Sequence, residues 1–545
     1  MRFPTLLILV LVAVGCESSS GPPIGPPIPV SDTIRTVTGR VEYFTTGPML
    51  STRDGEGRLL PQTGFIQPTL PRRAPSFLFD VLSPTGEILT QGVTDANGQY
   101  SVTINFGQGA QATPLILRVH AQINLPFGAV VRVLPDASAT EPYSYQSIPS
   151  GNPASNVMTV NLTIPLNENA GAYHILEVLR PGFIAAKSGI LATFPDMEIY
   201  WAPGNGATTR LLAGQKAELT VAGGIPGDST SNTDEWDDPK LMRMLGEYLL
   251  TYFSNEVAPD GTPNEALLVP SAAWREGFLD FWACMGRSSP EYWETEGSGL
   301  NGRVVRFFNV ESFLDSTLGT LGPDDPNVYQ HPSVVGIGSR FTVAEVLWDI
   351  HDAENEGGDT LEFPLFLTMR FFERIKPGSS YPYLYTLLDE YVADGALSEV
   401  KLQILLSLTP EDQGITYPAT HLDGSLWPRH FTRGDPGDPI GIGFDEQLQD
   451  AVDNVNPVPL NVEIGEMSQR YFTFNLSTTA DVTARVFSTA SLRVEILDYF
   501  NNVLASGVGS TVGQDLESDR YIVRVSPASG PANAAFDLQL QIAPP

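Results

Sequence analysis

The sequence predicts a multidomain α+β protein, with a β-sandwich at each end and a mainly helical domain between them. Three observations support this prediction. Apolar and polar residues alternate, with turn signals between the runs, in residues 36–124 and again from residue 457 onward. Between residues 234 and 408, apolar residues instead recur at the three-and-four spacing of helices. The 545 residues also exceed what one hydrophobic core usually supports.

The first residues predict export and a lipid anchor. Arg2 precedes an apolar run over residues 6–14, which is too short to cross a bilayer as a mature helix. The following "AVGC" resembles a bacterial lipobox, whose cysteine is acylated and becomes the new N-terminus, although Ala13 stands where a leucine is usual. We therefore predict a lipoprotein signal peptide over residues 1–16, with Cys16 as the lipidation site. An ordinary cleaved signal peptide is the alternative.

Residues 17–32, "ESSSGPPIGPPIPVSD", predict an extended tether, because Pro-rich and Ser/Gly-rich stretches cannot build a core. Glu17, rather than an aspartate, follows the cysteine, which favours the outer membrane or the cell surface of a bacterial envelope. The membrane is then a partner through the lipid anchor. The net charge of −32 argues against nucleic-acid binding. The second cysteine, Cys284, lies in the apolar "FWACMG" and is predicted to be a buried thiol.

Residues 33–165 predict the first β-sandwich. The stretch "SFLFDVLSPTGEILTQGVTDANGQYSVTI" alternates apolar with polar residues, and "PTG" and "DANG" supply tight turns. It resembles the carboxypeptidase-regulatory-like family, a small transthyretin-like β-sandwich in which the phrase "TDANGQYSV" is the recurrent element. The resemblance implies a structural spacer or a binding module, and it carries over no catalytic residue.

Residues 455–545 predict the second β-sandwich. The phrases "SQRYFTFNL", "SLRVEILDYFNNVLAS" and "RYIVRV" follow one another in strand-and-turn order. In this order they resemble the bacterial pre-peptidase C-terminal family, a β-sandwich that is appended to many secreted peptidases.

Residues 166–440 predict the helical domain. Four phrases resemble secreted bacterial zinc metallopeptidases of the gluzincin type: "GAYHILEVLRPGF", "DEWDDP", "SAAWREGFLDFWA" and "TVAEVLWDIHDA". They correspond, in order, to a pre-catalytic helix, the acidic lead-in to the active-site helix, and two later helices. The resemblance implies H-E-x-x-H on the active-site helix, where two histidines bind one Zn²⁺ and the glutamate activates water. A glutamate from the next helix completes the three protein ligands.

That motif is absent from this chain in every frame. The family register puts Arg243 and Glu247 at the two histidine positions. Met244 falls at the position of the general base, and Glu276 falls at the third ligand. None of the six histidines lies between residues 175 and 330, and no two are four residues apart. We therefore predict no catalytic residue, no bound metal and no cofactor, and we interpret these four residues as vestigial metal-site positions.

The residues that stand at the metal-site positions predict a cluster of ion pairs. Arg243 and Glu247 lie one helical turn apart and are expected to form a salt bridge. If the fold is kept, Glu276 approaches the same place, so that one guanidinium lies between two carboxylates. The planar fork of arginine suits carboxylates, so its charge stands in for the metal ion. The alternative is an ordinary exposed helix pair, with Glu276 elsewhere.

The sequence thus predicts a catalytically dead metallopeptidase-like domain that binds protein or peptide through an inherited cleft. Two alternatives stay open. One is an active zinc metallopeptidase with atypical ligands, such as His331 or His351 with Glu276. The other is a structural surface protein or adhesin in which the middle domain is a spacer. His174 has no other histidine near it in the sequence and is interpreted as structural. The acidic loop after His351 is interpreted as solvated, not as a calcium site.

Overall fold

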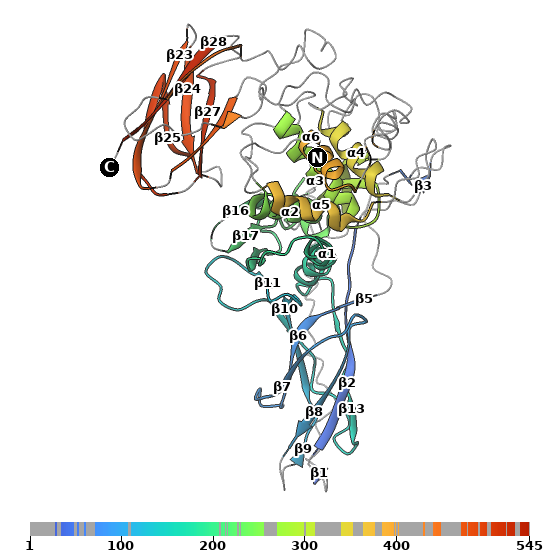
Figure 1. The fold of residues 1–545 in the computed structure, drawn as a ribbon. Coiled ribbons are helices and arrows are strands. Elements are labelled where there is room, and N and C mark those ends of the chain that lie inside the picture. Colours follow the sequence, from blue (N-terminus) through green and yellow to red (C-terminus); the bar gives the residue numbers. More distant parts are fainter. Residues whose placement is uncertain are drawn as a thin grey trace, which may run out of the picture. The chain divides into compact units, whose positions relative to one another are not determined.

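The fold was examined in a computed structural model (Figure 1). The residues that the structure describes are 28–29, 34–47, 52–53, 59–60, 71–106, 111–206, 209–212, 214, 216–225, 228, 230–254, 270–298, 301–310, 339–352, 363–375, 384–396, 398, 402, 429–430, 440–447, 470–476, 478–488, 491–498, 503–518, 520–528 and 535–543. They form a mixed α/β protein with many β-sheets and six α-helices. The predicted signal peptide and Cys16 lie outside these residues. In the described part of the chain, no helix is long and apolar enough to cross a membrane.

The chain divides into two compact units, and the first combines Met1–Tyr43, Pro71–His120 and Ser144–Glu168. Its main sheet is built around β2, which pairs antiparallel with β8 and β5 and parallel with β13 and β14. The bounds of these strands are β2 (Ile34–Tyr43), β5 (Arg72–Arg73), β8 (Gln99–Asn105), β13 (Val157–Thr159) and β14 (Leu162–Ile164). Alternate β2 residues are buried, as the alternation predicts.

The remaining strands of the first unit complete its core. β6 pairs antiparallel with β7, and β10 pairs antiparallel with β12. Phe79 of β6 packs on Tyr100 of β8, with ring centroids 4.6 Å apart. The predicted "DANG" turn precedes β8, where the Asp95 side chain accepts hydrogen bonds from the backbone N–H groups of Asn97 and Gln99. The bounds are β1 (Ile28–Pro29), β6 (Phe77–Leu82), β7 (Ile88–Val93), β9 (Gln111–Ala112), β10 (Ile116–Asn124) and β12 (Ser144–Gln146).

The second unit combines Phe44–Leu70, Ala121–Tyr143 and Asn169–Pro545. Before its helices it contains the strands β11, β15 and β17, which run parallel, and β16, which is antiparallel to β17; these four strands are part of an eight-stranded sheet. The long helix α1 lies between β14 and β15 in the sequence. The bounds are β3 (Thr52–Arg53), β4 (Leu59–Leu60), β11 (Val130–Leu134), α1 (Ala170–Lys187), β15 (Met197–Tyr200), β16 (Arg210–Leu212) and β17 (Ala217–Thr220).

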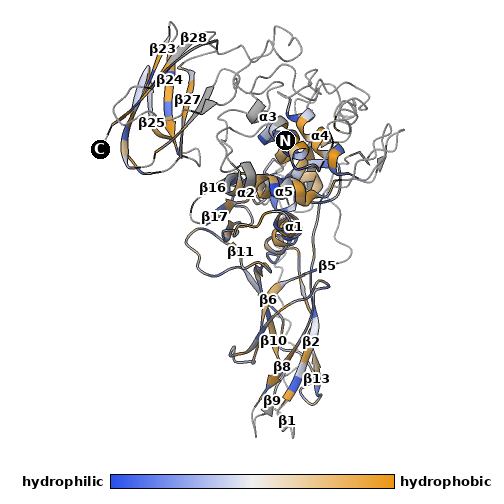
Figure 2. Ribbon diagram, in the orientation of Figure 1, coloured by the Kyte–Doolittle hydropathy of each residue, from blue (hydrophilic) through white to orange (hydrophobic). Residues whose placement is uncertain are grey.

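The predicted helical region contains the other five helices, which lie together in Figure 1. Most of their buried residues are apolar. Apolar stretches of these helices are orange in Figure 2. A short 3-10 helix, η1 (Asp234–Trp236), leads into α2, and the bounds of the helices are α2 (Asp238–Phe253), α3 (Pro270–Met285), α4 (Arg340–His351), α5 (Leu365–Ile375) and α6 (Leu384–Ala393). The region also contains an antiparallel hairpin of β18 (Glu291–Ser298) and β19 (Asn301–Asn309). This hairpin was not predicted, because the helical pattern on either side dominates the segment.

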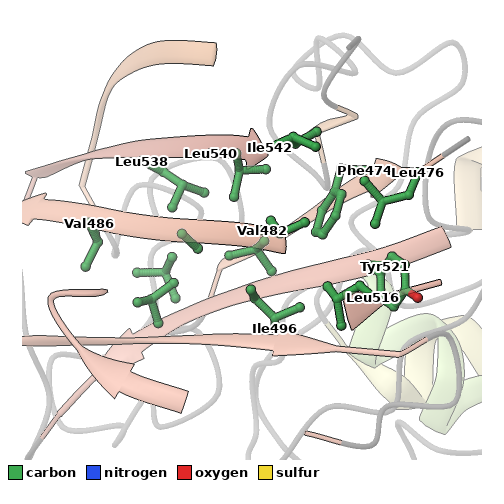
Figure 3. Close-up of a cluster of buried hydrophobic side chains, with 14 of the residues drawn as sticks. Phe474, Leu476, Val482, Val486, Ile496, Leu516, Tyr521, Leu538, Leu540 and Ile542 are labelled. Atoms are coloured by element: carbon green, nitrogen blue, oxygen red, sulfur yellow. The ribbon is translucent and has the colours of Figure 1, made fainter. Parts of the chain in front are cut away.

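The C-terminal region is made of two sheets packed face to face. Their strand orders are β20-β22-β27-β24-β25 and β21-β28-β23-β26. Apolar side chains from both sheets meet between them, among them Phe474, Val482 and Leu540 (Figure 3). Two strands, β20 and β21, come from before residue 455, where the sandwich was predicted to start. The bounds are β20 (Arg429–His430), β21 (Ile440–Gln447), β22 (Arg470–Asn475), β23 (Ala480–Ser488), β24 (Leu492–Leu497), β25 (Val503–Val508), β26 (Ser510–Leu516), β27 (Arg520–Pro527) and β28 (Ala535–Ala543).

Gly277 allows α3 and α4 to pack closely, and we expect Gly277→Ala to destabilise the helical region by about 1–3 kcal/mol. An added Cβ would lie 2.5 Å from the Val343 Cβ and 2.6 Å from the Arg340 carbonyl oxygen, and that backbone atom cannot rotate away. Urea unfolding followed by tryptophan fluorescence measures the loss, because Trp274 and Trp282 are buried in α3.

Gly246→Ala on α2 is the matched control. There the nearest atom to an added Cβ is the Leu279 Cδ2 at 3.1 Å, on a side chain that can move. Because alanine has a higher helix propensity than glycine, the substitution should recover much of the free energy that this contact costs. Equal losses for the two variants would contradict the proposed role of Gly277.

Candidate functional site

Helices α2, α3 and α4 place the predicted site residues. Pro239 occupies the first turn of α2, where its missing N–H costs no hydrogen bond. The Ser339 side chain caps α4 by accepting a hydrogen bond from the Thr342 N–H at 3.4 Å. Helices α3 and α4 pack closely at Gly277. Because of this packing, Arg340, the first residue of α4, lies at the face of α3 that also contacts α2.

Arg243 of α2 meets two carboxylates of α3. Its Nη2 donates a short hydrogen bond to the Glu276 Oε2, and its Nε lies 3.5 Å from the Asp280 Oδ1. Arg340 approaches the same pair from α4: its Nε donates to the Asp280 Oδ2 at 2.8 Å, and its Nη1 lies 4.0 Å from the Glu276 Oε2. The structure therefore brings Arg243 and Glu276 together, as the sequence-based hypothesis expects.

The partner of Glu247 differs from the expectation. Its Oε1 accepts a hydrogen bond at 2.9 Å from Arg275, and not from Arg243 one helical turn earlier. Arg275 also donates to the Glu276 Oε1 at 2.7 Å, so one guanidinium spans both glutamates. The reason is that Arg243 extends toward α3 and α4, where Asp280 and Glu276 hold it. Met244, at the general-base position, is a buried thioether that neither takes up nor releases a proton.

Sequence reasoning missed three members of this cluster. Asp280 follows Glu276 by four residues and so shares its helix face, which was a readable signal. Arg275 precedes Glu276 directly, and Arg340 lies two residues before the phrase "TVAEVLWDIHDA", but nothing in the sequence indicated their partners. The arginine cluster, as we call it here, comprises Arg243, Glu247, Arg275, Glu276, Asp280 and Arg340.

Three guanidinium groups and three carboxylates balance the charge of the arginine cluster. Arg243, Glu276 and Arg340 are at most 6% exposed, and Asp280 is fully buried. Burial by itself would raise the pKa of Glu276, but the charges of Arg243, Arg275 and Arg340 outweigh it and lower the pKa to about 2. The pKa of Arg243 is raised, because the charges of Glu276 and Asp280 outweigh the effect of burial. Glu276 and Arg243 are therefore ionised at neutral pH.

The arginine cluster does not fit a zinc ion. Zn²⁺ needs nitrogen, sulfur or oxygen donors with available lone pairs, and a guanidinium offers none. The Glu276 and Asp280 oxygens that a metal would use already accept hydrogen bonds or lie beside arginine nitrogens. Among the described residues, no group of three or more His, Cys, Asp or Glu is placed to hold a metal ion.

The side chains of His351 and His174 have other partners. Both ring nitrogens of His351 have partners, at 2.7 Å from the Phe363 carbonyl oxygen and 2.6 Å from the Thr368 hydroxyl. Burial lowers the pKa of His351 to about 4. His174, interpreted as structural, is buried and does have an acidic partner in space, because its Nε2 lies 2.8 Å from Asp238 of α2. His331 and the acidic loop after Asp352 lie outside the described residues.

The acidic lead-in to α2 is a second unusual feature. Asp237 accepts hydrogen bonds from the N–H and the hydroxyl of Thr295 in β18, so its carboxylate fastens the hairpin to the helix start and does not cap α2. Burial raises the pKa of Asp237 and of Asp234. Burial also raises the pKa of Glu235 to about 8. At neutral pH Glu235 is therefore largely protonated.

Comparison with known proteins finds structural matches of low similarity. No family model matches the chain, and no curated protein matches it. Among solved structures, 21% of the chain matches 96% of PliG, a periplasmic inhibitor of g-type lysozyme from Aeromonas hydrophila, at 9% identity and a TM-score of 0.16. A similar 21% matches 92% of the pre-peptidase C-terminal domain of a Bacillus anthracis collagenase, at 11% identity and a TM-score of 0.14. Of the families expected from the sequence, this last one appears among the matches.

Breaking the ion pair between Asp280 and Arg340 should cost about 3–5 kcal/mol, because the remaining charge stays buried. We expect this loss for both Asp280→Leu and Arg340→Met. The double variant should lose clearly less than the sum of the two, since it removes both charges. Urea unfolding followed by tryptophan fluorescence measures all three.

Lys240→Met is the matched control on α2, where Lys240 pairs with Glu294 at 3.2 Å and both side chains are about one-fifth exposed. It should cost no more than about 1 kcal/mol. Strict additivity of the two Asp280 and Arg340 substitutions would show that the groups do not act as a pair.

The raised pKa of Glu235 predicts a pH-dependent stability. Because the folded state holds this proton more tightly than the unfolded state, its contribution is complete below the unfolded pKa and is lost as pH rises from about 4.5 to 8. Glu235→Gln, which keeps an acceptor for the Gly224 N–H, should make the slope shallower by about 1.4 kcal/mol per pH unit. Urea unfolding at several pH values in this window measures how the free energy of unfolding changes with pH. Identical slopes for the natural chain and the Glu235→Gln variant would contradict a raised pKa of Glu235.

Proposed function

We propose that the protein is a lipid-anchored component of a bacterial cell envelope whose helical domain is a catalytically dead relative of secreted zinc metallopeptidases. The domain keeps the packing of the peptidase helices and binds protein or peptide. The lipobox-like "AVGC" and the Pro-rich residues that follow support the anchor. The phrases that resemble a peptidase, flanked by two β-rich regions of the kinds that accompany secreted peptidases, support the relationship.

One observation carries this proposal. The three positions that the family register assigns to zinc ligands, at Arg243, Glu247 and Glu276, lie around one place. Arg243 contacts Glu276 directly, and the single side chain of Arg275 spans Glu247 and Glu276. Arg243 and Glu276, which are 33 residues apart in the sequence, meet as the family register expects of two metal-site positions. A guanidinium held by buried carboxylates then replaces the positive charge of a metal ion.

The same arrangement explains why catalysis is lost. Water activation needs a Lewis acid with an open position and a nearby general base. Arg243 supplies charge but no coordination site, because a guanidinium donates hydrogen bonds and has no lone pair to offer. It donates to Glu276 and lies beside Asp280. Met244 cannot act as a base. Binding does not need these groups, because a fold and the chemistry once built on it are separable.

Restoring the motif tests the proposal. The triple variant Arg243→His, Met244→Glu and Glu247→His recreates H-E-x-x-H next to Glu276. We expect it to bind one zinc ion per chain, measured by elemental analysis after dialysis, whereas the natural chain should bind none. The natural chain should also bind fluorescently labelled casein peptides, measured by anisotropy, without chelator-sensitive cleavage.

The control adds Glu276→Gln to the triple variant and should weaken zinc binding by about tenfold or more, since one of three protein ligands is lost. A folded triple variant that takes up no zinc would show that these positions do not form an ancestral metal site. Chelator-sensitive cleavage by the natural chain would refute the loss of catalysis, and failure to bind the peptides would refute the binding role.

A further inference from the structure

The first unit contains a cavity that the proposed function does not use. It has a volume of about 800 Å³, within the range of ligand-binding sites. All of its lining residues belong to the first unit, and most come from β2, β8 and the segment around β14. Most of them alternate with the buried residues of their strands and so face away from the core, namely Thr38, Arg40, Glu42, Gln99, Ser101 and Thr163. Tyr100, which is buried, and Gly39 line the cavity from core-side positions of the same strands. The cavity therefore lies over the outer face of the sheet, and we call it the outer groove.

The outer groove has a rigid floor. The Tyr100 hydroxyl donates to the Val160 carbonyl oxygen at 2.7 Å, and the Arg40 N–H donates to the Asn161 Oδ1 at 3.0 Å. These bonds hold the short segment between β13 and β14 against β2. At Gly39 an added Cβ would lie 1.9 Å from the Val160 carbonyl oxygen, so this close approach requires glycine. The backbone under the groove is thus held in place before any ligand arrives.

The polar groups of the outer groove are mostly neutral and unused. In the described part of the chain, the side chains of Thr38, Gln99, Ser101 and Thr163 make no hydrogen bond, although they line the cavity. Hydroxyl and carboxamide groups both donate and accept, so they match ligands that do the same. Covering such groups with an apolar ligand that forms no hydrogen bonds with them is unfavourable, because their donors and acceptors are then left without partners.

The few charges in the outer groove are already compensated. The Arg40 guanidinium donates to the Glu42 carboxylate at 3.1 Å, and Asp95 accepts two hydrogen bonds from backbone N–H groups at its turn. One cation and two anions give no excess of positive charge, which a polyphosphate or another polyanion would need. The strands under the groove have their backbone groups paired, whereas an extended peptide that adds a strand needs an open sheet edge.

We propose that the outer groove binds a neutral oligosaccharide. A sugar chain presents many hydroxyls, each a donor and an acceptor, without net charge. Gln99 and Ser101 from β8 face one side of it, Thr163 and the Asn161 Nδ2 face the other, and the pair of Arg40 and Glu42 lies between them. Val93, which is 47% exposed, offers a small apolar surface for the C–H groups of a sugar ring.

Isothermal titration of the full exported chain tests this proposal. The probes are cellohexaose, maltohexaose and chitohexaose, with an oligogalacturonate as the polyanion and casein peptides as the polypeptide. At least one neutral hexasaccharide should bind with a dissociation constant of about 1 mM or lower. The variant Gln99→Ala with Ser101→Ala should weaken that binding by about tenfold or more, which is the loss of two to three hydrogen bonds.

Thr103→Ala is the matched control, because Thr103 is exposed on β8 but does not line the groove. It should bind as the natural chain does, and circular dichroism on heating should show all three proteins equally folded, since every changed side chain is exposed. Failure of all three neutral saccharides to bind would overturn the proposal. So would equal binding by the double variant, or binding of the polyanion or the casein peptides that depends on Gln99 and Ser101.

Discussion

A buried set of balanced charges sets the arrangement of the helical region. Burying one guanidinium or carboxylate alone is strongly unfavourable, so each must meet opposite charge in good geometry. The helices α2, α3 and α4 can satisfy this condition only in orientations that bring their charged faces together. Packing at Gly277 is compatible with the same orientation, because it lets the start of α4 approach α3. The charges that meet are Arg243, Glu247, Arg275, Glu276, Asp280 and Arg340.

An arginine differs from a metal ion in what it contributes at such a place. Both compensate buried carboxylates, and the planar fork of Arg243 adds direction to the charge. A metal ion, however, keeps an exchangeable position for water or substrate, whereas a guanidinium is a donor only. The stability of such a cluster does not depend on metal supply or on the neutral form of histidine. Under the proposed relationship to zinc metallopeptidases, the helical region exchanged reactivity for a permanently assembled core.

The first unit uses one strand for two purposes. Along β2, Val37 and Val41 point into the core, while Thr38, Arg40 and Glu42 face the outer groove. Because the side-chain period of a strand is two residues, both faces are specified together, and a shift by one residue would exchange them. Polar residues on an outer face need no explanation by themselves. A concave outer face with a rigid floor and unused neutral groups is a more specific arrangement.

Periodicity was enough to predict the helices and most strands. All six helices fall in segments whose apolar spacing predicts them, and the strands of both β-rich regions follow the alternation. The hairpin of β18 and β19 was missed because its alternation is short and lies between helical stretches. Proximity of Arg243 and Glu276 was predictable through a resemblance, not through spacing. The pairing of Glu247 with Arg275 was not, since local spacing favoured Arg243.

What the sequence determined by itself is what depends on neighbours along the chain: element types, the absence of H-E-x-x-H, and which residues alternate or share a helix face. What only the tertiary structure decided is which charges meet across elements. Asp280 with Arg340 and His174 with Asp238 are 60 and 64 residues apart in the sequence. Their contacts depend on how each helix is rotated about its axis. That rotation is set by the packing of all its neighbours together, so no local pattern encodes it.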